Sequence, residues 1–171
     1  PLGKAIARTV PGTSKKVPLE HGGKAANIVF DDAPLDQAVE GIVTGIFFNQ
    51  GHVCCAGSRL LVQESIADEL LDKLKRRMGT LRVGDPLDKS TDIGAIVAPV
   101  QLQRIRDLVR TGQAEGGTLW QASAPLPGVG NFCPPSVFIA VETASSVARV
   151  DRCGAGAGAD EFPKRRAGLW Q

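Results

Sequence analysis

The sequence predicts an α/β fold with a largely parallel sheet, either one globular domain or a large piece of one. Segments rich in Val and Ile alternate with longer segments that carry apolar residues at helical spacing, the pattern of strands joined by crossover helices. The 171 residues are 43% hydrophobic and 22% charged, which is enough apolar content for a packed core. The chain begins with Pro rather than Met, which indicates a fragment whose start lies upstream.

Charge, hydropathy and cysteine spacing exclude several function classes. The formal net charge is +2, so the overall balance does not indicate nucleic acid or a membrane surface as a partner. No run approaches the ~20 apolar residues of a membrane span, and the N-terminus is not a secretory signal, so we expect a cytoplasmic protein. The four Cys and two His lack the short, regular spacing of metal ligands, so we expect no metal site.

The first half of the chain predicts two helices with two short extended segments between them. Gly3–Val10 has the pattern of an amphipathic helix, which Pro11-Gly12 would end. The two segments predicted as extended are Lys15–Glu20 and Ala26–Phe30. A buried helix should begin near Asp31–Pro34, where Asp offers a cap and Pro fits the first turn, and Gly51 should end it.

The second half continues the alternation. A strand is predicted at Arg59–Gln63, and Ser65-x-x-Asp68 resembles a capping box at the start of a helix that runs to about Gly79. A polar loop, a helix and two strands should follow, at Val83–Thr91, Pro99–Gly116, Thr118–Gln121 and Ser136–Val141. Residues 151–171 are rich in Gly and Ala without periodicity, so we expect them to be disordered.

The stretch "FFNQGHVCCAGSR" carries the residues with the most chemical interest. Cys54 and Cys55 lie on a glycine-flanked turn beyond a predicted helix, where a thiol can be accessible. Alone, a cysteine is more often structural and a carboxylate such as Glu20 more often solvated. A Cys–His dyad with His52 or His21 is an alternative. A cysteine nucleophile with a glutamate base is the combination that forms and then hydrolyses a thioester.

Two motifs together resemble those of the NAD(P)-dependent aldehyde dehydrogenase superfamily. "PLEHGGKAANIVF" is similar to the family's L-E-L-G-G-K-S-P, and "FFNQGHVCC" to its F-x-N-x-G-Q-x-C. Glu20 and Cys54 fall on the two functional positions, 34 residues apart, as is usual in the animal enzymes. "VGDPLDKSTDIGAIVAP" resembles the segment that follows, so the resemblance spans about residues 3 to 150. "GAIVAPVQLQRI" and "LVQES" most resemble the family-sixteen branch.

The resemblance implies a mechanism and a set of site residues. Cys54 would attack an aldehyde, hydride would pass to NAD or NADP, and Glu20 would activate water to release a carboxylic acid. The Cys54 backbone N–H would form half of an oxyanion hole, and Cys55 would be a non-catalytic neighbour. Gly3 and Gln101 would contact the cofactor. The parent protein would be a homo-oligomer with an aldehyde substrate.

The resemblance also implies a partial aldehyde dehydrogenase fold and its boundaries. Residues 1–19 would end the cofactor-binding domain, residues 20–150 would form part of the catalytic domain, and residues 151–171 would be an aberrant tail in place of the family's E-E-x-F-G-P motif. The fragment alone should be inactive. His21 and His52 depart from the usual residues, so a non-catalytic scaffold and a cofactor-independent thiol esterase are alternative functions.

Overall fold

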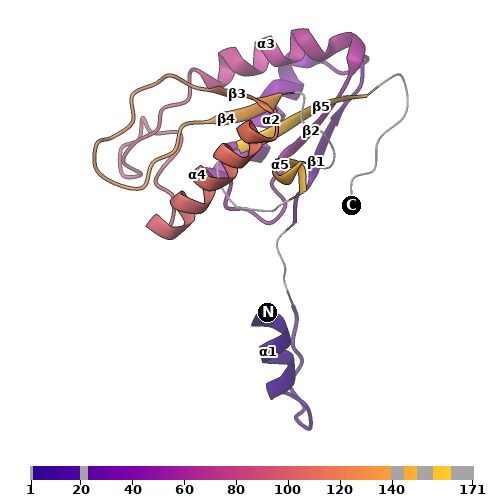
Figure 1. Ribbon diagram of the computed structural model, residues 1–171, viewed down its shortest axis with the longest axis vertical. Coiled ribbons are helices and arrows are strands. Elements are labelled where there is room, and N and C mark those ends of the chain that lie inside the picture. The colour runs from indigo at the N-terminus through magenta and orange to yellow at the C-terminus, as the bar shows by residue number, and fades with distance from the viewer. Residues whose placement is uncertain (1, 20–22, 140–144, 150–155, 163–171) are drawn as a thin grey trace.

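The computed structural model describes residues 2–19, 23–139, 145–149 and 156–162. A five-stranded sheet forms its centre, in the order β1-β2-β5-β4-β3 (Figure 1). The strands are β1 (Ala26–Val29), β2 (Arg59–Gln63), β3 (Thr118–Gln121), β4 (Ser136–Ile139) and β5 (Gly156–Phe162). Only β3 runs antiparallel to its neighbour, at one edge. The predicted α/β fold with a largely parallel sheet is therefore confirmed.

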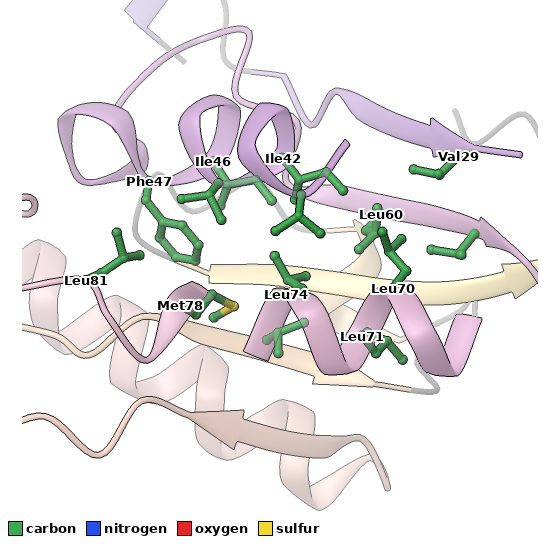
Figure 2. Packing of buried hydrophobic residues seen from close by; sticks show 14 of the residues in the cluster. Val29, Ile42, Ile46, Phe47, Leu60, Leu70, Leu71, Leu74, Met78 and Leu81 are labelled. Carbon is green, nitrogen blue, oxygen red and sulfur yellow. The ribbon is translucent and has the colours of Figure 1, made fainter. Parts of the chain in front are cut away.

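Helices pack on both faces of this sheet, and one further helix, α1 (Leu2–Thr9), precedes them in the chain. The packed helices are α2 (Leu35–Phe47), α3 (Ala67–Met78), α4 (Pro99–Ala114) and α5 (Ser146–Arg149). The main core joins α2 and α3 to one face, where Ile42, Ile46 and Phe47 of α2 point toward α3 and the sheet (Figure 2). On the other face, Phe138 and Val147 join β4 to α5 and α4. Alternate residues of β4 thus serve opposite faces, as the pleat of a strand requires.

The N-terminal segment stands apart from the sheet. Helix α1 lies at a distance from the other elements, and Lys4–Thr9 are exposed (Figure 1). The helix predicted there is confirmed. Residues 15–19 carry no strand, so the extended segment predicted at Lys15–Glu20 does not join the sheet over that stretch. The predicted boundary after residue 19 borders residues 20–22, which lie outside the described part.

Both predicted helix caps are wrong. Helix α2 begins at Leu35 after Pro34, and α3 begins at Ala67 after the short turn Glu64–Ile66, in each case without a side-chain cap bond. The side chains of Asp31 and Ser65 instead accept hydrogen bonds from Gln63 Nε2, over 2.7 and 3.2 Å. Gln63 is buried at the end of β2, and these oxygens satisfy its amide.

The expected disorder of residues 151–171 is wrong for residues 156–162. These form β5, which pairs parallel with β2 on one side and with β4 on the other. The remainder of that segment lies outside the described residues. None of the described helices is long and apolar enough to cross a bilayer. No group of three or more potential metal ligands occurs within the described ranges.

Candidate functional site

The pairing of β1 with β2 brings the two sequence motifs together. Parallel strands begin at the same edge of a sheet, so the segments that enter them lie side by side. Ala26 pairs with Arg59, and the Arg59 N–H donates to the Ala25 carbonyl over 3.1 Å. The chain before β1 carries the glutamate motif and the chain before β2 carries the cysteine motif. Both therefore meet at the amino ends of these strands.

The cysteine motif forms a tight turn that displays its thiols. The Ala56 N–H donates to the Val53 carbonyl over 3.1 Å, which closes a turn with Cys54 and Cys55 at its centre. Both cysteines are exposed, whereas Ala56 and Gly57 behind them are buried. The accessible thiol predicted at Cys54 is confirmed. The side chain of Cys55 is exposed as well, so exposure does not distinguish the two cysteines, and the non-catalytic role of Cys55 stays a prediction.

Three contacts hold the loop of the glutamate motif against the cysteine turn. A Cβ placed on Gly23 would lie 3.7 Å from the Cys54 carbonyl oxygen, so the two backbones approach closely. Lys24 Nζ donates to Ser58 Oγ over 3.3 Å. Asn27 Nδ2 donates to the Gly57 carbonyl over 2.8 Å, and a Cβ on Gly57 would lie only 2.3 Å from that nitrogen. A side chain at position 57 would therefore displace the Asn27 amide from this hydrogen bond.

The predicted base is not part of this described geometry. Glu20 and His21 lie outside the described residues, so the role of Glu20 stays a prediction. Its motif neighbours Gly23 and Lys24 are described, and they lie beside the turn that carries Cys54. The proximity of the two motifs is thus established for the part of the glutamate motif that the structure describes.

The chain reaches the cysteine turn through a left-handed turn, Phe48–Gly51. Asn49 has φ 49° and ψ 40°, Gln50 has φ 59° and ψ 21°, and Gly51 has φ 75°. This conformation costs roughly 1–2 kcal/mol for a residue with a side chain. The prediction that Gly51 ends the helix is only partly right, because α2 ends at Phe47 and the reversal begins at Asn49.

His52 lies between the left-handed turn and Cys54. Its N–H donates to the Asn49 carbonyl over 3.0 Å, and its carbonyl accepts from Asn49 Nδ2 over 3.3 Å. The ring is half-buried, and its Nε2 is buried without a hydrogen-bond partner among the described residues. Burial lowers the pKa of His52 below its usual value, because an imidazolium loses hydration there. The neutral ring is therefore favoured beside the thiol turn.

The two predicted cofactor contacts lie on separate helices. Gly3 is on α1, which stands apart from the sheet, and Gln101 is half-buried in the first turn of α4 (Figure 1). Within the described residues these two positions do not assemble a dinucleotide site, so no chemical step through NAD is derived from this chain. Their roles stay predictions.

Two site residues could not be singled out from the sequence. Asn27 and Gln50 act through hydrogen bonds to distant carbonyls, those of Gly57 and Ala95. The only hint in the sequence is a glycine at each acceptor, because glycine permits a close approach. Gly57 is itself one acceptor, and Gly94 precedes the other.

The chain is similar to known proteins over most of its length. Residues 1–155 match the model of the aldehyde dehydrogenase family. A betaine aldehyde dehydrogenase of Rhizobium johnstonii is 39% identical over 158 residues, which cover 90% of this chain and 32% of that protein. A hydroxyisobutyraldehyde dehydrogenase of Mycolicibacterium austroafricanum is 40% identical over 154 residues, covering 89% of this chain and 31% of that protein.

Solved structures of this family superimpose on the chain. An NAD-dependent aldehyde dehydrogenase from Sinorhizobium meliloti gives a TM-score of 0.88 at 35% identity, covering 95% of this chain and 32% of its own. Betaine aldehyde dehydrogenase from Staphylococcus aureus, solved in complex with NAD+, gives a TM-score of 0.88 at 30% identity. The match covers 95% of this chain and 33% of that one. These relatives lend no support to the family-sixteen branch. The chain spans about a third of their length, and over that span it belongs to the aldehyde dehydrogenase family.

Proposed function

We propose that this chain is the nucleophile-bearing part of an aldehyde dehydrogenase, which oxidises an aldehyde to a carboxylic acid with NAD or NADP. The observation that carries the proposal is the exposed Cys54 turn, held against the Gly23–Lys24 loop at the amino ends of β1 and β2. A nucleophilic thiol needs access, and the turn gives Cys54 that access.

Cys54 is the proposed nucleophile. Its thiolate would add to the aldehyde carbonyl, and the Cys54 N–H would donate to the oxygen on which negative charge develops. A nicotinamide cofactor, when bound, would supply the hydride acceptor that the oxidation of this adduct to a thioester requires, and Gly3 and Gln101 are the residues proposed to contact it. This chain's own contribution is the thiol, its turn and the facing loop.

Glu20 is the proposed base that activates water for hydrolysis of the thioester. The register of β1 on β2 supports this assignment. Paired residues such as Ala26 and Arg59 are 33 positions apart, and Glu20 and Cys54 are 34 apart. The two motifs are thus offset along the sequence by nearly the same number of residues as the two strands that follow them.

The test uses the protein at its full natural length. Aldehyde-dependent reduction of NAD or NADP is measured for the wild type, for Cys54→Ser and for the matched control Cys55→Ser. Betaine aldehyde and hydroxyisobutyraldehyde are the first substrates to try, because they appear in the names of two relatives. We expect Cys54→Ser to lower kcat at least about 10³-fold and Cys55→Ser to leave most activity. A folded wild type without turnover on any aldehyde, whose Cys54 resists iodoacetamide, would refute the proposal.

A further inference from the structure

The left-handed turn before the cysteines contains one residue whose conformation its own type does not explain. Asn49 and Gly51 are residue types that adopt positive φ readily, and Asn49 Nδ2 also donates to the His52 carbonyl. Gln50 has φ 59° between them, although glutamine has no preference for this region. A contact outside the turn must therefore hold Gln50 in place.

That contact is to the segment Gly94–Ile96. Gln50 Nε2 donates to the Ala95 carbonyl over 3.3 Å, and a Cβ built on Gly94 would lie 3.5 Å from the same nitrogen and 3.6 Å from Gln50 Cδ. The Gln50 amide thus lies at van der Waals distance from the position that a side-chain Cβ at residue 94 would occupy. This segment is itself well anchored, since the Ile96 N–H donates to the Asn131 carbonyl over 2.7 Å and Ile93 and Ile96 are buried.

Gln50 and Cys54 lie in two hydrogen-bonded turns, residues 49–52 and 53–56, that follow each other directly along the chain. The His52 N–H donates to the Asn49 carbonyl, and the Ala56 N–H donates to the Val53 carbonyl. The direction in which Gln50 leaves the left-handed turn therefore fixes the start of the turn that carries the thiol. We infer that Gln50 is a positioning residue for Cys54: it clamps the left-handed turn to the Ala95 carbonyl and so sets the orientation of the nucleophile. This inference rests on the proposed role of Cys54 and adds a residue to that site.

Two variants separate the side-chain clamp from the backbone conformation. Gln50→Asn tolerates positive φ, but its side chain is one methylene too short to reach the Ala95 carbonyl. Gln50→Gly accommodates the backbone without strain, so it keeps the fold, and it lacks the clamp. The control is Gln113→Asn on the exposed end of α4. Thermal unfolding of each variant of the full chain reports whether the fold is kept.

The readout is the rate at which iodoacetamide labels Cys54, measured as a ratio to Cys55 by peptide mass. In the wild type and the control we expect Cys54 to react faster than Cys55. Both Gln50 variants should bring this ratio toward one by at least about fivefold. An unchanged ratio in a folded Gln50→Gly, or equal rates in the wild type, overturns the inference.

Failure of this inference can be told apart from failure of the proposed function. Gln50-dependent labelling of Cys54 in a protein that oxidises no aldehyde would refute the proposed activity and leave the positioning role standing. Aldehyde oxidation that depends on Cys54, together with labelling that is indifferent to Gln50, would refute only the positioning role.

Discussion

At the scale of single residues, the titration of His52 makes the stability of the folded chain depend on pH. Burial lowers its pKa in the folded chain below the ordinary value of 6.5. Between the two pKa values the unfolded chain binds more protons than the folded chain, so stability is complete above about pH 6.5 and falls as pH falls below it. The pKa values of the Asp88 and Glu115 carboxyl groups are lowered as well. Their contribution to stability is lost only in stronger acid, as the pH falls below their ordinary pKa values of 3.8 and 4.5.

The prediction is that His52→Gln makes the chain less sensitive to mild acid. The wild type should lose more of its Tm than the variant between about pH 7.5 and pH 5.5, because glutamine does not titrate in this window. Thermal unfolding followed by circular dichroism at both pH values measures the difference. Equal losses in the two proteins would show that protonation of His52 does not oppose folding.

The sequence predicted the residues of the cysteine turn better than their setting. Cys54 could be selected because two motifs with the right order and spacing supported it, although exposure alone does not distinguish it from Cys55. The conformation of Gln50 could not be predicted, since it depends on a carbonyl 45 positions away along the chain. Residue type predicts positive φ only at Asn and Gly.

At the scale of elements, the two helix caps were predicted wrongly for the same reason: the outcome depends on contacts that exist only in the folded chain. Asp31 and Ser65 have the residue types of helix caps, and local sequence offers no competitor for them. Gln63 becomes a competitor only once β2 is buried, because its amide then needs acceptors inside the protein. Helix and strand positions, by contrast, follow from apolar spacing. Arg59–Gln63 and Thr118–Gln121 were predicted to the residue for this reason.

Two helical glycines should respond in opposite ways to alanine. A Cβ on Gly112 of α4 would lie 2.7 Å from Val147 Cγ1 and 2.8 Å from Phe138 Cζ, so Gly112→Ala should lower the free energy of unfolding by about 1–3 kcal/mol. Gly45 of α2 has nothing within 4 Å of that position, so Gly45→Ala should raise it by about 0.5–1 kcal/mol. Urea denaturation measures both changes. Stabilisation by both substitutions would mean that α4 and α5 do not pack as described.

At the scale of the whole molecule, the sheet depends on its last strand. In the described structure β5 lies between β2 and β4, and it connects the β1–β2 pair, which carries the thiol turn, to the β3–β4 pair. Its Gly/Ala-rich sequence has low strand propensity, which is why it could not be predicted as a strand. The backbone of β5 is held as a strand by its pairing with two neighbouring strands, although its residue types would not predict one.

Proline at Gly158 tests whether this strand holds the molecule together. Gly158 pairs with Arg59 of β2 and with Phe138 of β4, so its backbone lies in the middle of the sheet. Gly158→Pro removes an N–H and adds a ring between two paired strands, and it should cost about 3 kcal/mol or more in the free energy of unfolding. Gly158→Ala keeps the N–H and is the matched control, with a much smaller expected change. Because β2 begins directly after the cysteine turn, the proline variant should also lose the preference of iodoacetamide for Cys54. If residues 156–162 were a disordered tail, both variants would unfold like the wild type, with the same Tm and the same labelling.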